Sequence, residues 1–258
     1  MRSADPTEPF FVGYLNALPP GLRFFLSVVA VAFAGLFAGI AFAVALSQDD
    51  PGDGRFRFDL RYQTMTGWLE EKPYPLLHLP PSAEHPQGRT VMLSGGGKRG
   101  VQAAAAEFAG QIVDAGGIII RRGDLDMLQV GGKVRIRPTE APDAPDFTPL
   151  EPVDLGRWRL TGEICDGKCY AGAMRPGTGL AHKACANVCL IAGVPPVFVS
   201  TAPVDGRIFF LMSDADGNPL TEHLLNYVAQ SVRIDGQVER RGDLHVFKVD
   251  LATLERLQ

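Results

Sequence analysis

Residues 121–125, Arg-Arg-Gly-Asp-Leu, recur as residues 240–244 in this chain of 258 residues. Gly117 precedes the first copy at the same distance at which Gly236 precedes the second. Gly-Asp between two apolar segments is typical of the tight turn of a β-hairpin. The recurrence therefore predicts one small β fold that is used twice along the chain.

Two segments rich in turn residues set the limits of the predicted modules. Residues 49–54, Asp-Asp-Pro-Gly-Asp-Gly, have the composition of a short linker, and residues 138–152 contain five prolines. Proline at this density excludes a helix or a central strand. We therefore predict a first module over 55–137, a linker over 138–152 and a second module over 153–258.

The second module is expected to carry an insertion. Thr66-Gly67 near the start of the first module matches Thr161-Gly162 in the second. From that point to the shared hairpin, the second module is longer by nearly the length of segment 169–192. All four cysteines of the chain lie within or just before this segment, so we predict an inserted Cys-rich loop and helix.

Apolar runs bounded by turn residues predict short strands in both modules. The expected strands are 62–69, 90–94, 117–121 and 127–130 in the first module, and 157–165, 196–200, 206–212, 232–238 and 244–249 in the second. A helix is expected before the last hairpin of each module, at 101–108 and at 221–230. About five short strands with one helix are typical of a small, partly open barrel of the OB type. The predicted fold class is mainly β, with two OB-like modules.

The N-terminal region holds a long apolar segment. Residues 24–48 contain no charged side chain, and about 20 apolar residues cross the hydrocarbon core of a lipid bilayer. A cleaved signal peptide is the alternative, since Ala43-Val44-Ala45 resembles a cleavage site. The apolar run and the preceding segment 1–23 are both longer than in most signal peptides, so we expect an uncleaved transmembrane helix.

Two further features bear on this helix. Gly35 and Gly39 form a G-x-x-x-G pattern, which permits close contact with another helix, although chance spacing in a helix rich in small residues is the alternative. Arginines flank both ends of the span and leave its orientation undecided. The cysteine cluster and the usual behaviour of single-span anchors favour a cytoplasmic segment 1–23, with both modules in the periplasm or outside the cell.

Charge and motifs exclude several classes of function. The net charge of −4 argues against nucleic-acid binding, which requires a basic surface. The chain shows no Ser-His-Asp arrangement, no G-x-S-x-G and no prominent carboxylate pair, so a non-catalytic protein is favoured. Residues 94–100, Ser-Gly-Gly-Gly-Lys-Arg-Gly, resemble a phosphate loop, but they lack the Walker spacing and are better interpreted as a surface turn.

The cysteines are spaced as two C-x3-C pairs, Cys165 with Cys169 and Cys185 with Cys189. Residues 182–192 have helical composition and end at a glycine. Residues four apart in a helix cannot form a disulfide with each other. Cys185 and Cys189 would therefore pair with Cys165 and Cys169, in either order. Each bridge would contribute about 2–4 kcal/mol, and no cofactor would be bound.

Two other interpretations of this segment remain open. Cys169, His182, Cys185 and Cys189 could form a Cys3His metal site with Met174 nearby, and soft ligands of this kind suit zinc or Cu(I). Haem is less favoured because the chain has no C-x-x-C-H attachment motif. The third interpretation is a redox-active thiol pair in a thiol-disulfide oxidoreductase.

Residues 160–249 resemble a family of largely uncharacterised bacterial proteins that are exported or anchored to the membrane. The matching residues are Gly162, Glu163, Asp166, Lys168, Cys169, Tyr170, Met174, Pro176, Gly177, His182, Cys185, Cys189, Gly193, Pro195 and Pro196. The position of Cys165 is commonly aliphatic in the family, which favours the metal interpretation. The resemblance implies an OB-like barrel and association with periplasmic electron-transfer or molybdenum-enzyme systems.

These observations together predict a protein of the bacterial inner membrane. The favoured function is that of an anchored, non-catalytic accessory or assembly subunit, which would dock onto the subunits of a membrane redox complex. The alternative function is that of a metal-handling, haem-handling or electron-transfer protein.

Overall fold

The computed structural model describes residues 20–47, 52, 54–132, 135–140, 147, 149 and 151–257. Most of the predicted N-terminal segment and the centre of the proline-rich linker, residues 1–19 and 141–146, lie outside the described residues. The chain forms two compact units, residues 1–50 and 51–258.

The first unit contains one long helix, α1 (Pro20–Ser47). It begins at a proline, which is favoured at the first helical position because it has no N–H to leave unpaired. Its Gly21–Ala43 segment has a mean hydropathy of 2.4 and no buried residue, and it is long enough to cross a bilayer. The predicted apolar helix is confirmed. Membrane anchors and signal sequences share this property.

The second unit contains two sets of strands. The first set comprises β1 (Arg55–Phe56), β2 (Gln63–Glu70), β3 (Leu76–Leu79), β4 (Arg89–Ser94), β5 (Ile112–Arg122), β6 (Leu125–Val130) and β7 (Ile136–Pro138). Strand β2 pairs with β5 and β3, β3 with β4, β4 with β6, and β6 with β5. Only the β4–β6 pair is parallel, and β1 and β7 add to β5.

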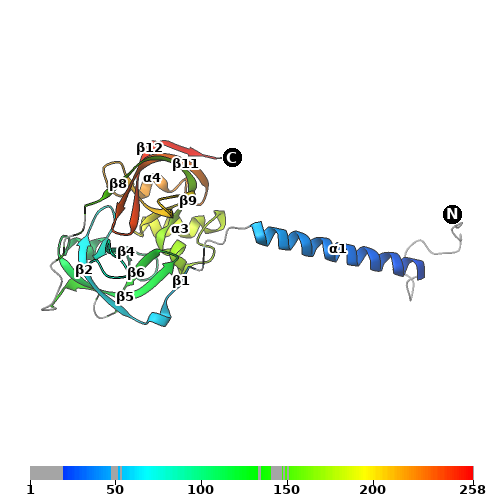
Figure 1. Ribbon diagram of the computed structural model, residues 1–258, viewed down its shortest axis with the longest axis horizontal. Coiled ribbons are helices and arrows are strands. Elements are labelled where there is room, and N and C mark those ends of the chain that lie inside the picture. The colour runs from blue at the N-terminus through cyan, green and yellow to red at the C-terminus, as the bar shows by residue number, and fades with distance from the viewer. Residues whose placement is uncertain are drawn as a thin grey trace. The chain divides into compact units, whose positions relative to one another are not determined.

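The second set forms a closed barrel in the order β10-β12-β11-β8-β9. Its strands are β8 (Val153–Asp166), β9 (Pro196–Val204), β10 (Arg207–Asp214), β11 (Ser231–Arg241) and β12 (Leu244–Arg256). Here too the third and fifth strands, β10 and β12, are parallel and the other pairs are antiparallel. The two sets therefore share one pairing order. Figure 1 shows the first set in cyan and green and the second in yellow-green through yellow to red.

The repeated sequence forms the same hairpin in both sets. Arg122 pairs with Leu125 between β5 and β6, and Arg241 pairs with Leu244 between β11 and β12. Both predicted hairpins are thus confirmed. In both turns the glycine has a positive φ, 52° at Gly123 and 61° at Gly242, a conformation that glycine adopts readily.

The matched glycines upstream also have a shared physical role. A methyl group at Gly117 would overlap the carbonyl oxygen of Gln129, and one at Gly236 would overlap that of Lys248. In each set the glycine therefore lets the long central strand lie very close to its hairpin partner.

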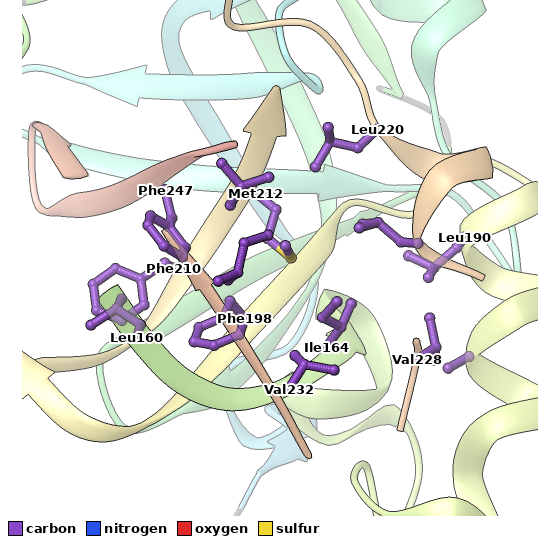
Figure 2. Close-up of a cluster of buried hydrophobic side chains, with 14 of the residues drawn as sticks. Leu160, Ile164, Leu190, Phe198, Phe210, Met212, Leu220, Val228, Val232 and Phe247 are labelled. Atoms are coloured by element: carbon purple, nitrogen blue, oxygen red, sulfur yellow. The ribbon is translucent and has the colours of Figure 1, made fainter. Parts of the chain in front are cut away.

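Four apolar clusters lie among the described residues of the second unit, and the smallest contains Cys169, Cys189 and Val194. One fills the barrel of the second set, where Phe198, Phe210 and Phe247 point inward together with aliphatic residues of β8 and β11 (Figure 2). Another lies within the first set. The third joins the two sets, with Met92 of β4 packed in one cluster with Leu211 of β10. Because residues of β4 and β10 alternate between two clusters, both faces of these strands are buried.

The short helices depart in part from expectation. Helices α2 (Gln102–Ala106) and α3 (Lys183–Ile191) lie within the predicted ranges. Helix α4 (Thr221–Leu224) is much shorter than predicted. The chain leaves the helical path and turns back to the barrel, where Ala229 has a φ of 62° and donates its N–H to the Ile164 carbonyl at 3.0 Å.

Candidate metal centre

Three of the four cysteines converge at one point of the second unit. Strand β8 ends at Asp166, and the next turn, η3 (Cys169–Ala173), carries the first of them. Helix α3 carries Cys185 and Cys189, one turn apart on one face. The Sγ atoms of all three lie within 4.8 Å of one another, and those of Cys169 and Cys185 are 3.8 Å apart.

All four cysteines, which lie within the described part of the chain, are free thiols. A disulfide requires sulfurs about 2.05 Å apart, so the predicted bridges are absent from this structure. One of the predicted pairs, Cys169 with Cys185, is nevertheless brought into contact. Both sulfurs also face Cys189, so no sulfur has a single exclusive partner.

Cys165 lies apart from this group. It points into the apolar cluster between the two strand sets, and its thiol donates to the Glu163 carboxylate at 3.4 Å. Burial raises the pKa of this thiol. The structure therefore separates Cys165 from the three other cysteines, whereas the disulfide prediction required it to pair with Cys185 or Cys189.

His182 is adjacent to the sulfurs without joining them as a fourth ligand. Its Nε2 lies 2.9 Å from Oδ2 of Asp166, and both residues are 0% exposed. A ligand atom of each lies within 4.8 Å of the Cys169 sulfur. The second carboxylate oxygen accepts the Cys169 N–H at 2.8 Å. Among the described residues, the predicted Cys3His set is thus three converging sulfurs with a His-Asp pair beside Cys169.

A cavity of about 470 Å³ opens onto the three sulfurs. Phe56, Ala173 and Met174 give it apolar walls, and Gln129 and two lysines add polar groups. Met174 is the thioether that the sequence placed near the site, and its position in this wall agrees with that expectation. Phe56 and Gln129 come from the first strand set, so both sets contribute to the cavity.

The two lysines bring positive charge to the thiols. Lys98 is exposed and donates from Nζ to the Cys185 sulfur at 2.9 Å, a hydrogen bond that raises the pKa of its ammonium. Lys168 is 3% exposed and donates to the carbonyl oxygens of Gly95 and Gly97, both at 2.6 Å. Burial lowers the pKa of Lys168.

The buried thiols also influence one another. The interaction between Cys169 and Cys189 raises the pKa of Cys169 and lowers that of Cys189. The arrangement therefore favours negative charge on the Cys189 sulfur, whose pKa the Lys98 ammonium also lowers.

The glycine-rich segment 94–100 has a role that the sequence did not reveal. Its carbonyl oxygens, at Gly95 and Gly97, point toward Lys168. A phosphate loop would instead direct its N–H groups at an anion. The segment is fixed to the cysteine region by a further bond, from the N–H of Gly100 to the carbonyl of Ala192 at 2.7 Å. It holds Lys98 beside the thiols.

Neither the scan against protein-family models nor the searches of curated proteins and of solved structures finds a match for this chain.

Proposed function

We propose that this protein binds one thiophilic metal ion through Cys169, Cys185 and Cys189. The convergence of the three sulfurs supports the proposal most directly. Zinc–sulfur bonds of about 2.3 Å place the sulfurs of a tetrahedral site about 3.8 Å apart, and the Cys169 and Cys185 sulfurs have this separation.

The metal function accounts for the thiols better than either alternative. A disulfide uses two sulfurs and would leave the third buried beside it. Catalytic thiols of oxidoreductases are partly exposed and have a lowered pKa. Here no single cysteine combines the two properties, because Cys189, whose pKa is lowered, is buried, and Cys169 is buried with a raised pKa. A metal ion uses all three sulfurs together, and it protects them from oxidation outside the cytoplasm.

The ligand set favours Zn²⁺ or Cu⁺, because thiolates and thioethers are the ligands these ions prefer. Haem iron takes one or two axial ligands from the protein, and three converging sulfurs do not match that pattern.

We further propose that each strand set is an OB-like module and that segment 169–192 is an insertion in the second. The shared pairing order and the two equivalent hairpins support this. The OB-type barrel is a five-stranded Greek key that is partly open. The fold alone carries no function.

We also propose that α1 is an uncleaved anchor in the bacterial inner membrane, with the second unit in the periplasm. There the protein would act as an accessory subunit of a membrane redox complex and present its metal centre to that complex. The Gly35 and Gly39 face of α1, where an added methyl group would meet nothing within 4 Å, suits contact with a partner helix. Affinity purification of the tagged protein from mild detergent tests this role: redox subunits that are lost in a Gly35→Leu variant would support it.

Metal analysis of the full chain, purified in detergent without oxygen or chelator, tests the metal proposal. We expect about one metal ion per chain and an intact mass that corresponds to four free thiols. Cys169→Ser, Cys185→Ser and Cys189→Ser should each lower the metal content strongly. Cys165→Ser is the matched control and should retain the metal. A wild-type protein without metal, or a Cys165→Ser protein that loses it, would contradict the proposal.

A further inference from the structure

The three sulfurs occupy one side of the metal position. Among the described residues, the group of mutually close ligand atoms around them contains no fourth cysteine, histidine or carboxylate. His182 is engaged by Asp166. Structural zinc sites use four protein ligands, whereas sites with three keep a position for an exogenous ligand. Asp166 and His182 lie beside Cys169 and are bonded to each other, whereas the cavity is lined by all three cysteines.

We propose that the bound metal takes a soft sulfur anion, an organic thiolate or hydrosulfide, as its fourth ligand within this cavity, and that Lys98 positions it. This inference rests on the proposed metal function and specifies the ligand of the same site. Lys98 is a positioning residue, because its contact with Cys185 places its ammonium at the edge of the metal position.

The charges lining the cavity favour an anion. Lys168 is buried, and the negative groups that act on it are the Cys169 and Cys189 sulfurs and the Asp166 carboxylate. Two of its three N–H groups donate to backbone carbonyls. A buried cation is unfavourable without compensating negative charge. The thiolates supply part of that charge, and an anion in the cavity would add to it.

The apolar residues that line the cavity determine which kind of anion can bind there. Phe56, Ala173 and Met174 present apolar surface, which disfavours strongly hydrated anions because they would lose their water on entry. A sulfur anion is weakly hydrated and matches the softness of a metal already bound by thiolates. Binding exchanges one ligand for another: water leaves the metal as the sulfur–metal bond forms, the proton of the thiol passes to the buffer, and no electrons are transferred.

The glycine-rich segment forms one border of the cavity through Gly97 and Lys98. Gly96, Gly97 and Lys98 are exposed, and a methyl group at Gly96 or Gly97 would meet nothing within 4 Å. On this side the cavity is therefore bordered by glycine backbone, which carries no side chain. Met174 is the competing ligand within the chain, because its thioether lines the same cavity and could close the fourth position.

The experiment uses the full chain in detergent, loaded with Co²⁺ as a spectroscopic substitute for Zn²⁺. The sulfur-to-cobalt charge-transfer band is followed while methanethiolate or hydrosulfide is added, with dimethyl sulfide and chloride as the neutral and the hard-anion controls. We expect saturable binding of one or both sulfur anions and a band about one third stronger, because a fourth thiolate joins three. The anion that binds more tightly identifies the source of the sulfur.

Variants test the position of the ligand. Lys98→Ala should weaken sulfur-anion binding by about tenfold, since it removes a charge close to the anion, and Lys98→Arg should restore most of it. Arg99→Ala is the matched control on the same segment and should bind as the wild type does.

The outcomes separate this inference from the metal proposal. Cobalt that binds with the three-thiolate spectrum and does not respond to either sulfur anion overturns the inference alone. A band that is already at four-sulfur strength and falls in Met174→Leu shows that Met174 closes the site, which also overturns it. Cobalt that the added thiol removes from the protein does the same. A chain that binds no cobalt overturns the metal proposal itself.

Discussion

Asp166 connects His182 to Cys169 through its two carboxylate oxygens. One oxygen lies 2.9 Å from the imidazole Nε2, and the other accepts the Cys169 N–H at 2.8 Å. Asp166 and His182 are inaccessible to solvent, and Cys169 is buried. One buried carboxylate thus fixes the start of the turn that carries the first sulfur and the orientation of the neighbouring imidazole. Groups that orient metal ligands in this way commonly influence affinity strongly.

Replacing this carboxylate by its amide should therefore weaken metal binding. We expect Asp166→Asn to lower the affinity for Zn²⁺ by about 10- to 100-fold, as measured by competition with a chromophoric chelator. Asp235→Asn is the control, because Asp235 pairs with exposed Arg159 on the outside of the barrel. Equal affinities in the two variants would show that the connection has no part in metal binding.

The close approach at the matched glycines predicts a specific loss of stability. Gly117→Ala and Gly236→Ala each place a methyl group against a backbone carbonyl, which cannot move aside without disturbing the hairpin. We expect each to lower the free energy of unfolding by about 1–3 kcal/mol, as measured by urea denaturation. Gly131→Ala, where the methyl group meets nothing within 4 Å, should unfold as the wild type does. A wild-type midpoint in both test variants would refute the explanation.

The bonds from Lys168 to the glycine-rich segment predict a change in protease sensitivity. Lys168→Gln removes the ammonium that holds Gly95 and Gly97, so segment 95–100 should open more often. Trypsin should then cleave after Lys98 or Arg99 several-fold faster than in the wild type, and peptide mass spectrometry locates the cut. Lys183→Gln, which removes an exposed lysine on α3, serves as control. Unchanged cleavage in Lys168→Gln would mean that other contacts hold the segment.

His245 predicts a dependence of stability on pH. Burial lowers its pKa below the ordinary value of 6.5, an effect that Asp205 opposes and that Arg207 and Arg240 reinforce. The unfolded chain therefore takes up the proton first as the pH falls through 6.5. The folded state should lose stability below that pH and keep it above.

Urea denaturation on either side of pH 6.5 measures this dependence. In His245→Gln the decline of stability on acidification should be smaller than in the wild type. The exposed His223→Gln should decline as the wild type does. A full decline in His245→Gln would assign the pH dependence to another group.

Much of the strand pattern could be predicted from the sequence, because apolar runs and turn residues act locally. The two Gly-Asp turns and the strands of the second set, such as β9 (Pro196–Val204), lie where they were expected. Strand β3 (Leu76–Leu79) was missed because Pro73 and Pro75 precede its four residues, and proline argues against a strand. Its pairing with β2 and β4 stabilises it, which no local pattern shows.

The candidate site could be predicted only in part. The helix that carries Cys185 and Cys189 follows from composition and is present as α3. The contact of Lys98 with Cys185 joins residues 87 positions apart and arises only when the two strand sets pack together. The place of Cys165 also depends on that packing, because the cluster that buries it contains residues of both sets.

The glycine-rich segment of one strand set lies against thiols of the other, so the proposed metal binding would be thermodynamically linked to the docking of the two sets. A ligand at a concentration of 100 times its dissociation constant stabilises the state that binds it by about 2.7 kcal/mol. Part of this free energy would stabilise the contact between the two strand sets. The linkage is reciprocal. A partner that pulled the sets apart would release the ion, and one that pressed them together would retain it, so a mechanical contact far from the sulfurs could load or empty the site.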